Sequence, residues 1–361
     1  MAARIVVFGA TGYTGRLVAE RLVAQGARPV LAGRDDQRLA ELAERLGGLE
    51  TAHADAMRQN SVFDLVGKGD VLISTVGPFM KWGRAAVRAA VAAGAVYLDS
   101  TGEPPFIRRV FEEFDGPARR SGAALLPAMG YDFVPGALAG ALAVEAAGAA
   151  ARVDVGYYAL GAGLSSMSSG TRESMVGVTF TDAFAYRDGR LTTVRSAERV
   201  RSFDVQGRRR EAVSVGGAEH FGLPAAYPEL SEVNVYLGWF GPLARPLQAG
   251  TLVGEYVAKL PFARAAMQFW AEQAAALLRG PEAGTTPGGT SWIAAEAYDA
   301  GGAKLSEVHL SGVDAYDFTA SFIAWAARHP VLGTGALGPV EAYGLEALER
   351  GAAAAGLTRV P

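Results

Sequence analysis

The stretch FGATGYTGRLVAERL, residues 8–22, joins an apolar run typical of a β-strand to a run with helical spacing of its apolar residues. Gly9, Gly12 and Gly15 are evenly spaced across this junction. A turn that brings backbone N–H groups against a diphosphate needs residues without a Cβ where it tightens, where the ligand approaches, and where helix and strand touch. The helix N-terminus adds a partial positive charge. The stretch therefore predicts a phosphate-binding turn.

Further donors lie between these glycines, because Thr11, Tyr13 and Thr14 contribute N–H groups and hydroxyls. The spacing is G-x-x-G-x-x-G rather than the tighter G-x-G-x-x-G, and glycines also serve ordinary turns between a strand and a helix. The position after the first strand of an alternating β/α series favours a dinucleotide-binding turn over an ordinary one.

The end of the second predicted strand bears on which dinucleotide binds. An acidic residue at this place usually holds a free ribose 2′-hydroxyl. Here the strand ends in Gly33 and Arg34 follows, with Arg38 one turn into the next helix. A guanidinium suits a 2′-phosphate, so the sequence favours NADP(H) over NAD(H). In the alternative, Asp35 or Asp36 binds the ribose, although we favour a helix-capping role for this pair.

The alternation of short aliphatic runs with longer helical runs continues to about residue 130. The strands are apolar throughout, as central parallel strands buried on both faces are. This pattern predicts an α/β fold with a Rossmann-type, doubly wound parallel sheet.

The pattern changes near residue 150, where period-two strands and turn signals begin. Turns at 187–190, at Gly207 and at 299–302 predict hairpins of a mostly antiparallel sheet in a second, α+β domain. Helical stretches interrupt it near 135–148, 170–178 and 245–278.

These patterns give three expected parts. We expect an NADP-binding Rossmann domain at 1–148, a substrate and dimerisation domain at 149–311, and C-terminal helices at 312–361 that pack back on the first domain.

Composition excludes several classes of site and partner. The chain has no cysteine, so disulfides, zinc–thiolate sites and thiol nucleophiles are absent, and its four histidines lack metal-ligand spacing. A net charge of −3 argues against a nucleic-acid partner. The apolar stretch 235–260 is broken by prolines and charges, which predicts a buried or dimer-forming helix rather than a membrane span. The sequence runs at once into its first strand, which predicts a cytoplasmic protein. Nothing in the sequence suggests a metal site, and we expect a small-molecule substrate.

Three further motifs carry a resemblance to a known family. They are STVGPF at 74–79, VYLDSTGE at 96–103 and MGYDFVPGALAG at 129–140, joined by the looser SMSSGTRES at 166–174 and SGVDAYDFTASF at 311–322. With the glycine stretch and Gly33-Arg34, they resemble the saccharopine dehydrogenase-like oxidoreductases, which include a bacterial branch of trans-acting enoyl reductases. A cysteine that many relatives carry before the Y-x-D strand is missing here.

The resemblance implies NADP binding and a homodimer. It implies that residues 9–15 bind the diphosphate, that Arg34 binds the 2′-phosphate, and that four residues line the nicotinamide side: Val76, Gly77, Pro78 and Phe79. The fourth strand ends just before Gly77-Pro78, at the carboxyl edge of the sheet where ligands bind in such folds. A plain strand-ending turn is the alternative.

Hydride transfer also needs a proton source. Tyr97, Asp99, Tyr131 and Asp132 all fall near the carboxyl ends of predicted strands, and are our candidate catalytic residues. Each has a structural alternative: Asp99 can cap the helix that opens at Pro104-Pro105, Asp132 can cap the next helix, and the tyrosines can be packing aromatics.

Two other catalytic motifs are absent. No lysine follows a tyrosine by four positions, which excludes the Tyr–Lys pair of short-chain reductases, and no G-x-S-x-G elbow is present. The sequence therefore favours an NADPH-dependent reductase of a C=C or C=N bond in a small or moderately hydrophobic metabolite. The alternative is a non-catalytic NADP(H)-binding sensor or partner-binding protein.

Overall fold

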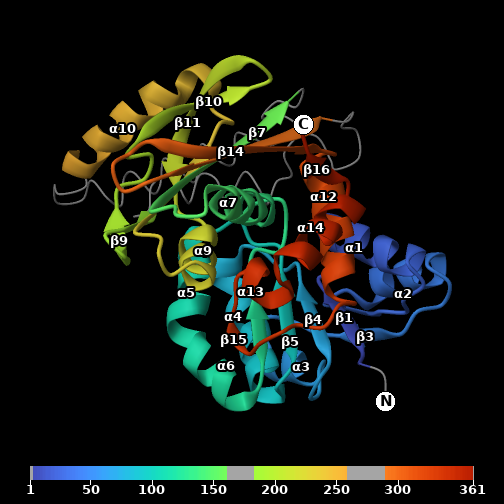
Figure 1. Ribbon diagram of the computed structural model, residues 1–361. Coiled ribbons are helices and arrows are strands. Elements are labelled where there is room, and N and C mark those ends of the chain that lie inside the picture. The colour runs from blue at the N-terminus through green and yellow to red at the C-terminus, as the bar shows by residue number, and fades with distance from the viewer. Residues whose placement is uncertain (1–2, 161–182, 258–288, 361) are drawn as a thin grey trace. The chain divides into compact units, whose positions relative to one another are not determined.

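The computed structural model describes residues 3–160, 183–257 and 289–360 (Figure 1). These residues form two compact units. The first comprises Met1–Gly102, Phe106–Val134 and Ala315–Leu357, and the second comprises Glu103–Pro105, Pro135–Asp314 and Thr358–Pro361. The helix at 134–147 groups with the second unit, and residues 315–357 group with the first.

A seven-stranded parallel sheet forms the centre of the first unit. Its order is β15-β6-β5-β4-β1-β2-β3, which confirms the Rossmann-type prediction. The strands are β1 (Ile5–Phe8), β2 (Val30–Gly33), β3 (Thr51–His53), β4 (Val71–Ser74), β5 (Val96–Asp99), β6 (Ala124–Leu126) and β15 (Gly335–Ala336). The central strands are buried because they carry aliphatic residues on both faces, as at Val6 and Val7.

Helices connect these strands and cover the sheet. They are α1 (Tyr13–Ala24), α2 (Asp36–Arg45), α3 (Gln59–Phe63), α4 (Phe79–Ala93), α5 (Pro104–Arg109), a π-helical turn (Val110–Phe114) and α6 (Asp115–Ser121). Three more come from the C-terminal part of the chain: α12 (Ala315–Ala326), α13 (Pro339–Tyr343) and α14 (Leu345–Ala354). Figure 1 shows α12, in red, beside the blue α1, where the Tyr13 and Tyr316 rings meet edge to face at 5.0 Å.

The second unit contains a nine-stranded mixed sheet, mostly antiparallel as expected. Its strands are β7 (Arg152–Leu160), β8 (Ala183–Arg187), β9 (Arg190–Val194), β10 (Val200–Val205), β11 (Arg208–Val215), β12 (Glu232–Leu237), β13 (Thr290–Tyr298), β14 (Lys304–Gly312) and β16 (Leu357–Arg359). Helices α7 (Val134–Ala147), α9 (Glu219–Ala226) and α10 (Ala244–Val257) accompany it. The predicted turns join β8 to β9, β10 to β11 and β13 to β14.

Several elements differ from the sequence expectation. The C-terminal part is not wholly helical, since it contributes β15 and β16, and α9 was not expected. The helical stretch near 170–178 and the part of 245–278 beyond residue 257 lie outside the described residues.

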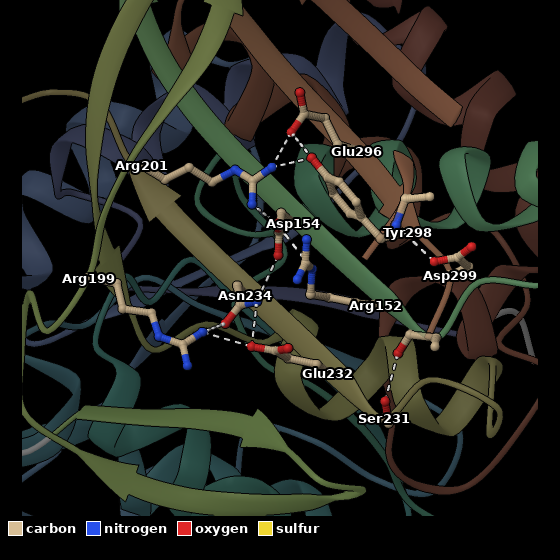
Figure 2. Close-up of polar contacts among 12 residues, drawn as sticks. Arg152, Asp154, Arg199, Arg201, Ser231, Glu232, Asn234, Glu296, Tyr298 and Asp299 are labelled. Carbon is tan, nitrogen blue, oxygen red and sulfur yellow. Dashed lines mark hydrogen bonds and ion pairs between the residues drawn. The ribbon is translucent and has the colours of Figure 1, made fainter. Parts of the chain in front are cut away.

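In the second unit, a network of polar side chains links β10 with β7, β12 and β13 (Figure 2). Arg201 on β10 bonds Asp154 on β7 and both Glu296 and Tyr298 on β13. Asp154 and Glu296 are register partners, 0% and 3% exposed. Asn234 on β12 also donates to Asp154, at 2.7 Å. Because two buried carboxylates side by side repel, the Arg201 guanidinium between them stabilises the arrangement. Arg152 lies 3.5 Å from Asp154 and Lys304 lies 3.5 Å from Glu296, which adds further positive charge.

Candidate active site

The glycine turn has the shape that a diphosphate requires. β1 ends at Phe8, and Gly9 then takes a φ of +90°, which favours glycine. The Gly9 N–H donates to the carbonyl of Ala32 on β2 at 2.9 Å, and the Gly12 N–H donates to the carbonyl of Gly9 at 2.9 Å. The turn therefore ends at the N-terminus of α1, at the carboxyl edge of the sheet.

Close packing explains two of the three glycines. A Cβ on Gly15 would overlap the Gly9 carbonyl and lie 2.7 Å from the Thr75 hydroxyl, and one on Gly9 would lie 2.8 Å from the same oxygen. Thr75 directly follows β4, and its hydroxyl donates to the carbonyls of Phe8 and Gly9, both at 3.2 Å. Thr75 lies within the STVGPF motif but is not among the predicted site residues.

The N-terminus of α1 can accept an anion. Gly12 occupies the N-cap position and has no side chain to cap the helix, and the first turn carries no acidic residue. The first N–H groups of the helix and its dipole suit a phosphate. Thr11, Tyr13 and Thr14 are partly exposed around this end.

Two arginines lie after β2. Arg34, next to Gly33, is exposed. The Arg38 guanidinium donates to the carbonyl of Thr11 at 3.1 Å, which ties it to the glycine turn. Asp35 caps α2 by accepting the Arg38 N–H at 3.0 Å.

Asp36 pairs with His53 at 2.9 Å. Both aspartates considered as ribose ligands thus already have other partners, and the capping role favoured for Asp35 is what the geometry displays.

The segment Val76–Phe79 borders the glycine turn. A Cβ on Gly9 would lie 2.9 Å from Val76 Cγ2, so the two loops touch. Gly77 is exposed and precedes a cis peptide bond to Pro78, after which α4 begins. The Phe79 ring is buried against Phe106, with centroids 5.6 Å apart. The Gly77 backbone is thus exposed beside the glycine turn, whereas the Phe79 ring lies in the core.

Two of the candidate proton donors lie in the core. Tyr97 and Asp99 on β5 are both 0% exposed. Burial and the neighbouring Asp99 carboxylate raise the pKa of Tyr97 well above its usual value. Asp99 Oδ1 accepts the N–H groups of Thr101 at 2.9 Å and Ala128 at 2.8 Å, which braces the loops after β5 and β6.

The other two donors lie in the loop after β6. The Tyr131 ring is buried, with its edge toward Phe318 at 6.4 Å. Asp132 is partly exposed, and a Cβ on Gly102 would lie 2.9 Å from its Oδ2. Burial raises the pKa of Asp132 to about 6. Among the four candidates, Asp132 alone combines surface access with a pKa that permits proton exchange near neutrality.

Among the residues that the structure describes, no group of three or more His, Asp or Glu side chains is placed to hold a metal ion. No helix within the described ranges is long and apolar enough to cross a membrane. The serine-rich segment 166–174 lies outside them.

Comparison with known proteins agrees with this geometry. A family model described as NAD(P)H-binding matches residues 9–97, the segment that holds the glycine turn and the Val76–Phe79 loop. Saccharopine dehydrogenase (L-Glu forming) from Saccharomyces cerevisiae superposes with a TM-score of 0.60 over 97% of this chain and 96% of that one, at 12% identity. The chain has the saccharopine dehydrogenase fold. The expected resemblance to the saccharopine dehydrogenase-like oxidoreductases is confirmed.

Sequence relatives of this chain share about a third of its length. Proteins named as trans-acting enoyl reductases are 40% identical over 139 residues in Mycobacterium tuberculosis and 35% over 137 in Mycobacterium ulcerans. A "Lipid droplet localized protein" of Caenorhabditis elegans is 32% identical over 143 residues. Each match covers 36% of this chain and 33–34% of the relative. The matched part thus spans about a third of these relatives.

Proposed function

We propose that this protein is an NADPH-dependent reductase that transfers a hydride to a C=C bond of a small or moderately hydrophobic metabolite. The observation that carries the proposal is the glycine turn within a segment that matches the NAD(P)H-binding family. Relatives named as enoyl reductases favour a C=C bond over a C=N bond, which is the second choice.

The preference for NADPH over NADH rests on the residues after β2. Arg34 is exposed at the position where a ribose 2′-substituent binds in this fold, and Arg38 lies against Thr11 of the glycine turn. The carboxylate of Asp35 is used as a helix cap. Two guanidinium groups suit a phosphate better than a hydroxyl.

The chain's own residues supply positioning and a proton. A bound nicotinamide supplies the hydride in this chemistry. The Val76–Pro78 backbone would hold its ring beside the glycine turn. The Asp132 carboxyl would give its proton to the second carbon of the reduced bond, its O–H bond breaking as the new C–H bond forms. The carboxylate left behind regains a proton from solvent.

Cofactor choice is tested by fluorescence titration with NADPH and NADH. Arg34→Ala should weaken NADPH binding by about 10- to 100-fold, as expected for a lost charge-assisted contact to phosphate, and leave NADH binding unchanged. Arg45, an exposed arginine at the C-terminal end of α2, provides the matched control variant Arg45→Ala. Equal effects on both dinucleotides would contradict a 2′-phosphate role for Arg34.

Turnover is tested by NADPH oxidation with a panel of enones, enoyl thioesters and imines. Reduction of the first two classes supports the proposed activity, and reduction of imines alone favours the C=N alternative. Tight NADPH binding without turnover of any class would support the non-catalytic sensor instead.

We propose that the protein forms a homodimer, as the family resemblance implies, and that it acts on a small molecule in the cytoplasm. Sedimentation analysis and cell fractionation test these two points separately.

A further inference from the structure

The loop that carries Asp132 has a strained backbone at both ends. Ala128 has a φ of +59° and Phe133 a φ of +90°, values that residues with a Cβ rarely adopt. Such conformations persist only where neighbouring groups hold them in place. The contacts of residues 128–133 therefore determine where the Asp132 carboxyl lies.

The first half of this loop is held by β5. Asp99 accepts the Ala128 N–H on its side chain at 2.8 Å and the Met129 N–H on its carbonyl at 2.7 Å.

The second half is held by α12. Thr319 Oγ1 accepts the Tyr131 N–H at 2.9 Å, across 188 positions of sequence. The same hydroxyl donates its hydrogen to the Ala315 carbonyl at 2.7 Å, so the lone pair that accepts the Tyr131 N–H is directed at the loop. Gly130 packs on this side chain, since a Cβ there would lie 3.0 Å from both Thr319 Oγ1 and Cγ2.

We infer that Thr319 is a positioning residue for Asp132: its hydroxyl fixes the 130–132 backbone so that the Asp132 carboxyl lies against Gly102. Thr319 belongs to the SGVDAYDFTASF motif, which the proposed function does not otherwise use. The side chain is 8% exposed and acts on the backbone next to Asp132, so it is not a catalytic residue itself. This inference rests on the proposed function for its catalytic meaning.

Its structural content is independent of turnover. Since burial holds the pKa of Asp132 at about 6, a loop released from α12 should give the carboxyl more water and lower its pKa. The titration of Asp132 therefore reports on the Thr319 contact in the unliganded protein.

The experiment is an NMR titration of protein labelled with ¹³C at the aspartate carboxyl carbon, in which Asp132→Asn assigns the Asp132 signal. Thr319→Val, which keeps the shape but removes the hydroxyl, should lower the Asp132 midpoint by about one pH unit. Thr319→Ser should restore the wild-type midpoint. Ser321→Ala removes a hydroxyl from the same helix and should leave it unchanged.

A second variant approaches the contact from the other side. Gly130→Ala places a Cβ against Thr319 and should move the midpoint in the same direction as Thr319→Val. If Thr319→Val does not fold, the Asp132 midpoint in Gly130→Ala tests the inference instead. An unchanged midpoint in a folded Thr319→Val or Gly130→Ala protein would overturn the inference, as would a lowered midpoint in Thr319→Ser.

With an active enzyme, the same variants give a kinetic readout. Thr319→Val should reduce kcat by about 10-fold and move the pH profile with the NMR midpoint, while the NADPH Kd stays within about twofold of wild type. Absence of turnover in the wild type would refute the proposed function and leave the NMR result on Thr319 standing.

Discussion

Gly15 is required by the packing of the fold and, in the proposed function, by the cofactor as well. It brings α1 against the end of β1, and its missing side chain leaves room for the Gly9 carbonyl and the Thr75 hydroxyl. We expect Gly15→Ala to weaken NADPH binding by at least about 10-fold, and to lower the free energy of unfolding by about 2 kcal/mol because the overlap must be relieved by backbone movement. Titration and urea unfolding measure the two effects.

The control for this prediction is Gly67→Ala. An added Cβ there would lie 3.7 Å from Asp70, an ordinary contact, and the residue is exposed. Equal losses of NADPH binding in both variants would refute the close-packing argument for Gly15.

Asp132 offers a test through the pH dependence of stability. Its folded pKa of about 6 exceeds the ordinary aspartate value, so the folded state holds a proton that the unfolded state releases between about pH 4 and 6. Wild-type stability therefore loses a contribution as pH rises through this range. The Asp132→Asn variant, which cannot titrate, should gain on the order of 2 kcal/mol relative to wild type between pH 4 and pH 8.

Urea unfolding at several pH values measures this difference. A constant offset between the two proteins would mean that Asp132 titrates near its ordinary value. If Asp132 also supplies the proton for reduction, kcat/KM should fall as pH rises above about 6, in step with its deprotonation.

At the scale of single elements, β10 shows how a strand is fixed by charge rather than by apolar contact alone. Its Arg201 lies between Asp154 and Glu296, and also beside the Tyr298 ring at 5.1 Å (Figure 2). Arg201→Met would leave two buried carboxylates side by side. We expect the free energy of unfolding to fall by about 3–5 kcal/mol at pH 8, as for other broken buried ion pairs.

The loss of unfolding free energy in Arg201→Met should be smaller at pH 5 than at pH 8. Without the guanidinium, repulsion and burial raise the pKa values of the two carboxyls in the folded state, so protonation at lower pH relieves the strain. Urea unfolding at pH 5 and 8 measures this, with the exposed Arg208→Met as the control on the neighbouring strand. A loss independent of pH would show that Arg201 acts mainly through packing.

At the scale of the whole molecule, local signals in the sequence predicted what is locally determined. The glycine turn, the apolar strands β1, β2 and β4 to β6, and the three hairpin turns all depend on residues close together in the chain. The strand β15 has only two residues, which is too short for a periodic pattern, and it pairs with β6, which lies about 200 residues earlier in the chain. The Tyr131–Thr319 hydrogen bond also joins residues far apart in the sequence. Because contacts of this kind cannot be inferred from local patterns, the sequence gives no means to rank the four candidate proton donors.

The first unit takes its residues from both ends of the chain, and this leads to a last prediction. NADPH should slow amide hydrogen exchange in α12 and α14 as well as in β1 and α1, because α12 contacts α1 through Tyr316 and an Arg21–Asp317 ion pair at 3.0 Å. At 100 times its Kd, a ligand stabilises the unit that binds it by about 2.7 kcal/mol, so exchange that requires unfolding of the unit should slow about 100-fold. Exchange in β7 and β13 should change less.

Arg34→Ala at the same NADPH concentration is the control, and should lose most of the protection in β1 and in α12 together. This coupled loss distinguishes one cooperative unit from a nucleotide-binding segment with separately folded C-terminal helices. If the amide hydrogens of α12 and α14 exchange at the same rate with and without NADPH while those of α1 are protected, then residues 315–354 unfold independently of the glycine turn. In that case the Tyr316 and Asp317 contacts would be too weak to join the two ends of the chain into one folding unit.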